Sequence, residues 1–159
     1  MAHSTLSPDT QRILRHLLAT IAYRASRSLK NSPAEFENTR LSDDGMSARE
    51  LLLHMTNVIA FATATVMGTD RIRHEALEWQ HEVRRFYSLL AKVDARIAAG
   101  VVLEEGMDLK LVQGPFADVL THIGQLHAMR RRAGSAVAPA NYIKATVNVG
   151  RISLDAQPD

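Results

Sequence analysis

Apolar residues recur every three or four positions along most of the chain, which is the spacing of amphipathic helices rather than of strands. The first such stripe predicts a helix over residues 8–31, where Pro8 suits the first turn because an N–H at that position would have no partner. Pro33 disfavours helical geometry in the residue before it and so places the end of this helix near Asn31. The stripe consists of Leu14, Leu17, Leu18, Ile21 and Ala25.

A second helix is predicted over residues 47–68. Ser47 and Glu50 have the spacing of a capping box, in which the hydroxyl accepts from the backbone of the glutamate and the carboxylate accepts from the backbone of the serine. Gly68 marks the end of this helix. The polar connection before it, residues 32–46, is expected to be the longest between any two helices.

Two further helices are predicted over residues 70–99 and 108–133. The last is expected to end with Gly134 as the first residue beyond it. Pro115 either starts this fourth helix or kinks it, and the pattern does not decide between the two. The third helix carries a regular apolar seam made of Trp79, Val83, Phe86, Leu90, Val93 and Ile97.

Four amphipathic segments without a strand pattern predict an all-α fold, a four-helix bundle. The length of 159 residues is that of one domain, so residues 1–159 are expected to form a single unit. The segment after Pro139 is too short for a second domain and is expected to pack along the bundle as a C-terminal extension.

Charge and composition narrow the function classes. The chain has 19 Lys and Arg against 17 Asp and Glu, interspersed, which predicts no nucleic-acid partner. The absence of cysteine excludes a disulfide framework, a thiolate nucleophile and a Cys-ligated metal site. We expect no apolar run to reach the roughly 18–20 residues of a membrane helix. A cytoplasmic protein with no membrane partner is therefore predicted.

The fourth predicted helix carries three polar residues within an apolar segment. Asp118, His122 and Gln125 follow one another at steps of four and three, so they share one stripe of the helix. Because Leu, Ile and Val residues flank that stripe, we expect it to face the core, unless the helix faces solvent there. Burying an unpaired carboxylate costs several kcal/mol, and a metal ion is an efficient partner for one.

The second predicted helix shows a similar interruption, because His54 lies on a face that is otherwise apolar. Together with Asp118 and His122 it would form a site of two histidines and one carboxylate. Such a set suits Zn, Fe(II), Ni or Mn, and three protein ligands leave open positions for water or substrate. The hypothesis is therefore a catalytic rather than a structural metal site.

Each residue also has a purely structural interpretation. His54 alone fits a hydrogen-bonded core histidine, and Asp118 alone fits an exposed helix residue or a partner of the Arg130–Arg132 run. A pair formed by Asp118 and His122 can be structural as well. His74 and His81 are expected on the solvated face of the third helix, among glutamates.

Two segments resemble the DinB/YfiT-like helical-bundle proteins. The segment from Asp118 to Gly134 is similar to the last-helix motif of that family, which has a histidine followed by x-Gly-Gln, an Arg-rich helix end and a glycine. Leu51–His54 is similar to the histidine segment of the family's second helix. The resemblance implies that a divalent metal is bound by three histidines, of which His54 and His122 match two. The third falls on Asp118, a carboxylate in place of the family's histidine.

The resemblance implies a metal-dependent enzyme that acts on a small molecule, either a transferase using a low-molecular-weight thiol or a hydrolase. The alternative is a non-catalytic bundle that binds a small ligand or a partner, with the histidines and the aspartate in a buried hydrogen-bond network. We also expect a homodimer, because Trp79, Phe86 and Tyr87 place more apolar surface around the third helix than one small core needs.

Overall fold

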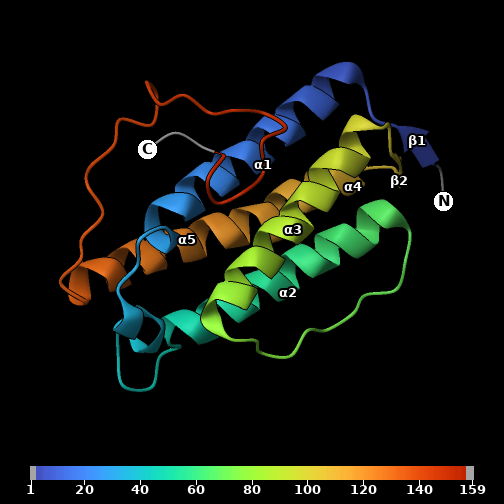
Figure 1. The fold of residues 1–159 in the computed structure, drawn as a ribbon. Coiled ribbons are helices and arrows are strands. Elements are labelled where there is room, and N and C mark those ends of the chain that lie inside the picture. The colour runs from blue at the N-terminus through green and yellow to red at the C-terminus, as the bar shows by residue number, and fades with distance from the viewer. Residues whose placement is uncertain (1–2, 157–159) are drawn as a thin grey trace.

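The structure is a computed structural model that describes residues 3–156, so both ends of the predicted domain lie outside the described residues. It is mostly helical, with 60% helix and 5% strand, which confirms the all-α class. The long helices pack side by side around a common core (Figure 1). They are α1 (Pro8–Leu29), α2 (Ala48–Met67), α3 (Trp79–Ala98) and α5 (Ala117–Arg132).

The predicted apolar stripes form the core. Every residue of the α3 seam is buried, and Phe36, Phe86 and Phe116 are among the largest side chains that solvent does not reach. Trp79 packs edge-on against Phe36 with ring centroids 5.7 Å apart. Since Trp79, Phe86 and Tyr87 are only 6%, 0% and 4% exposed, the expectation that they offer spare apolar surface for a dimer is wrong.

Local capping determines both ends of α2. The Ser47 hydroxyl accepts from the Glu50 N–H at 3.2 Å, and the Glu50 carboxylate accepts from the Ser47 N–H at 2.7 Å. Gly68 ends the helix in the left-handed region at φ 66°, where a glycine is favoured. The connection before α2, residues 30–47, contains the short 3₁₀ helix η1 (Ala34–Asn38) and is longer than the connection between α2 and α3.

The predicted start of the third helix at residue 70 is wrong, because residues 69–78 form an extended connection and α3 begins at Trp79. The Glu78 side chain caps α3 by accepting from the backbone N–H groups of Gln80 and His81. His74 therefore lies in the connection and not on a helix.

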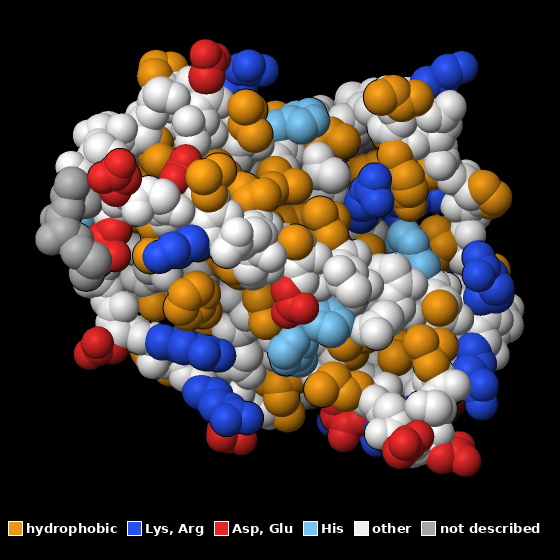
Figure 2. Space-filling view, turned by 180° about the vertical axis from the view of Figure 1, so that it is seen from behind, with side chains coloured by type: hydrophobic (Ala, Val, Ile, Leu, Met, Phe, Trp, Pro, Cys, Tyr) orange, Lys and Arg blue, Asp and Glu red, His pale blue; other side chains and the backbone are white. Residues whose placement is uncertain are grey.

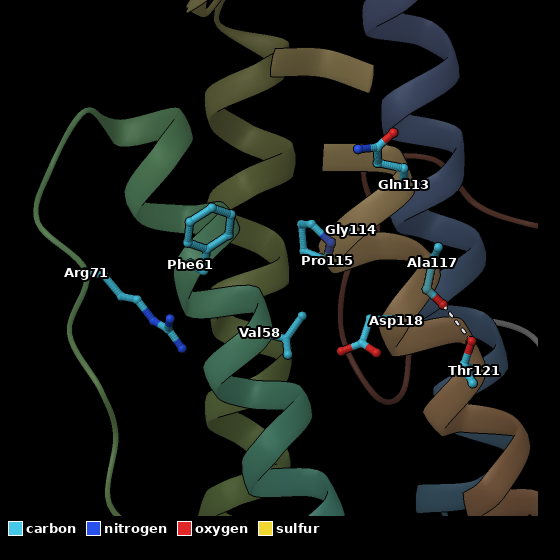
Figure 3. A pocket seen from close by; sticks show the side chains of 9 residues that line it. All are labelled: Val58, Phe61, Arg71, Gln113, Gly114, Pro115, Ala117, Asp118 and Thr121. Carbon is cyan, nitrogen blue, oxygen red and sulfur yellow. Dashed lines mark hydrogen bonds between the residues drawn. The ribbon is translucent and has the colours of Figure 1, made fainter. Parts of the chain in front are cut away.

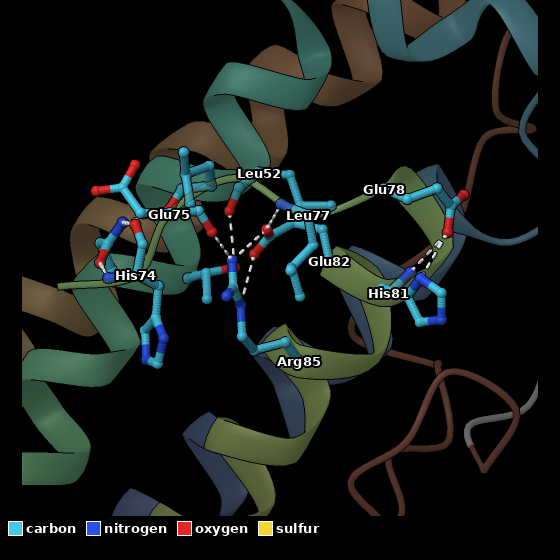
Figure 4. Close-up of polar contacts among 11 residues, drawn as sticks. Leu52, His74, Glu75, Leu77, Glu78, His81, Glu82 and Arg85 are labelled. Atoms are coloured by element: carbon cyan, nitrogen blue, oxygen red, sulfur yellow. Dashed lines mark hydrogen bonds and ion pairs between the residues drawn. The ribbon is translucent and has the colours of Figure 1, made fainter. Parts of the chain in front are cut away.

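Side chains of α2 and α3 hold this extended connection in place (Figure 4). The Asn57 side chain accepts from the His74 N–H at 2.8 Å and donates to the His74 carbonyl at 3.2 Å. Glu82, which is 1% exposed, accepts from the Leu77 N–H at 3.3 Å and pairs with Arg85. Arg85 also donates to the Glu75 carbonyl at 2.7 Å. Hydrogen bonds to neighbouring helices thus replace the helical bonds expected for this segment.

Pro115 kinks the last helix rather than starting it. The helix begins as α4 (Met107–Leu111), widens into the π-helical turn η2 (Val112–Phe116) and continues as α5. A proline has no N–H for the regular helical bond, and the wider turn accommodates it within a continuous helix. Gly134, at φ 71°, lies just beyond α5 as expected.

The two ends of the described chain pack against the helices. A short antiparallel pair that the sequence pattern did not predict joins β1 (His3–Thr5) to β2 (Val102–Glu104). The segment after α5 runs back along α1 (Figure 1), and Ile152 belongs to the core cluster while Val147 and Leu154 pack against it. The predicted C-terminal extension is therefore confirmed within residues 3–156.

Among the described residues, α2 is the one helix long and apolar enough to cross a membrane by length and composition. The expectation that no segment reaches this length is wrong by that criterion. A core helix of a globular protein passes the same criterion, and α2 buries Leu51, Leu52, Met55 and Ile59 against its neighbours here.

Candidate metal centre

Neighbouring helices bring the three predicted ligands together. His54 projects from α2 toward α5, on which Asp118 and His122 lie one turn apart. The His54 Nε2 atom lies 3.3 Å from Asp118 Oδ2, and the His122 Nε2 atom lies 3.3 Å from Asp118 Oδ1. The two imidazole rings meet edge to face, with centroids 4.7 Å apart. The convergence inferred from the sequence is thus present in the fold.

The spacing of these atoms fits a single ion. Ligands bound tetrahedrally at roughly 2.0–2.1 Å lie about 3.3–3.4 Å from one another, and each histidine lies at this distance from one of the two oxygens of Asp118. One ligand atom from each residue can be chosen so that all lie within 4.8 Å of one another. The group can therefore hold a metal ion.

The hydrogen bond of His122 to Gln125 adds a chemical argument for a cation. As oriented in the structure, the Gln125 amide places its carbonyl oxygen 2.7 Å from His122 Nδ1, which pairs with the tautomer that has its proton on Nδ1. In a neutral His122 the Nε2 atom is then an acceptor, and it faces a second acceptor, Asp118 Oδ1, at 3.3 Å. Two facing acceptors need a proton or a cation between them. Holding one ring nitrogen so that the other can ligate is also the usual arrangement around metal-bound histidines.

The polar stripe does not face the core as the sequence pattern predicted. The side chains of His54 and Asp118 are 39% and 42% exposed, and that of His122 is 17% exposed. Figure 2 shows histidine side chains against an acidic one on the open surface of one face. The centre is consequently a surface site between α2 and α5, accessible to small molecules, and desolvation of the carboxylate is not what demands a cation.

No protein-family model, curated protein or solved structure matches this chain.

A hollow of about 520 Å³ opens beside Asp118 (Figure 3). Val58 and Phe61 of α2 form one wall, and Asp118 and Pro115 form the wall across from it. The π-helical turn contributes Gly114 and Pro115 to this wall, so the kink in the last helix shapes the hollow. Pro115 thus belongs to the surroundings of the candidate metal centre.

A second hollow of about 550 Å³ lies on the other side of His54. The extended connection forms its outer wall with Arg71, Arg73 and His74. Partial burial, together with the nearby Arg85 cation, lowers the pKa of His74, which favours the neutral imidazole. Arg71 lines both hollows, the one that contains Asp118 and the one that contains His54. No sequence pattern indicated Arg71, because its place depends on the course of the connection.

The other basic residues take structural roles. His81 is exposed and pairs with Glu78 at 2.9 Å, as expected for a solvated face. His127 lies outside the centre, and burial with nearby arginines lowers its pKa. Arg130 is 7% exposed and donates to carbonyl groups at the end of α1, including that of Ser28 at 2.7 Å.

Proposed function

We propose that this protein is a metal-dependent enzyme acting on a small molecule, of the DinB-like kind that its two motif segments resemble. The observation that carries the proposal is the convergence of His54, Asp118 and His122, with the Nε2 of His122 and a carboxylate oxygen of Asp118 facing each other as two acceptors. The reaction proposed is either transfer using a low-molecular-weight thiol or hydrolysis.

A divalent transition metal, Ni, Zn, Fe or Mn, would supply Lewis acidity that lowers the pKa of a thiol or a water. The protein side chains have separate tasks. His54 and His122 offer neutral nitrogen donors, and Asp118 offers a charge that offsets the cation. Gln125 keeps His122 in the tautomer that can ligate. Three protein ligands would leave positions open for water or substrate, and Asp118 and His54 each line a hollow that a small molecule can enter.

The DinB-like assignment is supported by the order of the elements. One histidine comes from the second long helix, and the other two ligand positions lie four residues apart on the last. Asp118 departs from the all-histidine set of that family, and a carboxylate is a sound ligand for the same metals. We further propose that the chain forms one domain and acts in the cytoplasm.

A second candidate is a non-catalytic bundle that binds a small ligand or a partner chain. It is favoured by the same 3.3 Å contact, because a proton on His122 Nε2 satisfies Asp118 as a cation does. Metal content separates the two candidates. A stoichiometric divalent metal supports the enzyme, and a metal-free protein of equal stability supports the binding module.

Gln125→Ala is expected to lower Zn²⁺ affinity by about 10–100-fold, the usual effect of removing a hydrogen-bond partner of a ligating histidine. The affinity can be measured by competition with a chromophoric chelator. Gln80→Ala, an exposed glutamine at the start of α3, is the matched control and should bind as the wild type does. Equal affinity in Gln125→Ala and wild type would show that Gln125 does not orient a ligand.

The predicted homodimer gives a second measurable outcome. The aromatic residues of α3 are buried and do not support a dimer. Other apolar side chains are exposed along the end of α2 and the connection after it: Phe61 (41%), Met67 (49%) and Ile72 (69%). We expect light scattering to return about twice the chain mass of 17.6 kDa at micromolar concentration. A value near the single-chain mass would contradict the dimer.

A further inference from the structure

We infer that the metal centre serves a small substrate carrying a carboxylate, and that Arg71 binds this group. The inference rests on the proposed function and adds to it the chemical class of the substrate. Arg71 lines the hollow that contains Asp118 and also the hollow that contains His54. Figure 3 shows its side chain reaching from the connection toward Val58, with Asp118 pointing in from the opposite wall. Arg71 therefore lies beside the hollows of two of the three candidate metal ligands.

The N–H groups of the Arg71 guanidinium are available to bind a ligand. Within residues 3–156 no hydrogen bond or ion pair involves its side chain, although most other arginines here have a carboxylate or carbonyl partner. Its one described contact is with the Phe61 ring, whose centroid lies 5.9 Å away. Contact with the face of an aromatic ring steadies a guanidinium while leaving its N–H edge free.

The backbone that carries Arg71 is anchored on both sides. Before it, the Thr69 N–H donates to the Ala64 carbonyl at 3.0 Å, and after it, Asn57 binds both backbone groups of His74. Only a few residues separate the two anchors, so the backbone of Arg71 is held beside α2 before any ligand binds. A held backbone lowers the entropy that the arginine loses on binding.

The chemistry of the guanidinium selects the class of ligand. A single planar fork matches the two oxygens of a carboxylate in a bidentate pair. A substrate with a metal-binding atom at one end and a carboxylate at the other would pair with both the metal ion and Arg71. Since Arg71 is exposed, solvent screens the pair and its effect on affinity is moderate, about tenfold.

The test uses Co²⁺-loaded full-length protein and two thiols of matched length. 3-Mercaptopropionate carries a carboxylate and 3-mercaptopropanol a hydroxyl, and binding of either thiolate to Co²⁺ is followed by its charge-transfer absorption. We expect wild type to bind 3-mercaptopropionate about tenfold more tightly than 3-mercaptopropanol, after correction for the different pKa values of the two thiols. Arg71→Gln should lose this preference and keep its affinity for Co²⁺ and for the alcohol. Arg84→Gln, which removes an exposed arginine on α3, should keep the preference and so controls for net charge.

The outcomes separate this inference from the proposed function. A wild type without the carboxylate preference, whether both thiols bind equally or neither binds, overturns the inference but leaves the metal centre intact. A preference that survives in Arg71→Gln also overturns it. Failure of the wild type to bind Co²⁺ removes the metal centre, and the substrate class with it. Arg71→Lys, which keeps the charge without the fork, should retain only part of the preference.

Discussion

His54→Ala and His122→Ala are each expected to lower Zn²⁺ affinity by more than about 100-fold, since losing only a hydrogen-bond partner of a ligand already costs about 10–100-fold. The double variant should lose little more than either single one. Ligands of one ion act as a unit, so removing the first already abolishes most of the affinity. Competition titration with a chromophoric chelator measures all three variants against wild type.

Substitutions at Asp118 test the role of the carboxylate. Asp118→His should retain the metal, because it restores the three-histidine set that the DinB-like resemblance implies. Asp118→Asn should weaken binding, because the amide lacks the charge that offsets the cation. His81→Ala is the matched control for the two histidine variants, since His81 is an exposed histidine that pairs with Glu78. Equal affinity in wild type and in the His54→Ala/His122→Ala double variant would contradict the site.

Glu82→Ala is expected to destabilise the fold by about 3 kcal/mol, the lower end of the range for breaking a buried ion pair. The Glu82 side chain is 1% exposed, and its loss leaves Arg85, 18% exposed, without its charge partner. The Leu77 N–H loses its acceptor in the same variant. The free energy of unfolding from urea denaturation measures the effect.

Glu75→Ala is the matched control for Glu82→Ala. Its side chain is exposed in the same connection, and the contact of Glu75 with Arg85 uses the backbone carbonyl, which the substitution keeps. The control should change stability by less than about 0.5 kcal/mol. A loss of similar size in both variants would show that Glu82 is no more important to the connection than a surface glutamate.

The parts of the fold that follow from local chemistry could be predicted from the sequence. The Ser47–Glu50 capping box and the glycines after α2 and α5 involve residues close together in the chain, and each lies where the pattern placed it. The start of α3 could not be predicted in this way. It depends on Asn57 of α2, which binds the backbone of His74 17 positions further on.

The candidate site also has parts that follow from local sequence and parts that depend on tertiary contacts. The four-residue spacing of Asp118 and His122 places them on one side of a helix whatever the tertiary structure, and His54 stood out as a break in an apolar face. Their exposure could not be predicted, because it depends on how closely α2 and α5 approach. Arg71 gave no signal at all, since only the anchored connection brings it to the centre.

The most direct measurement is the metal content of the untagged, full-length protein as purified, determined by elemental analysis together with that of the His54→Ala/His122→Ala double variant. A metal centre at His54, Asp118 and His122 predicts about one divalent transition-metal ion per chain in wild type and close to none in the double variant. A metal-free wild type whose stability chelators do not change, or equal metal content in the two proteins, would contradict it.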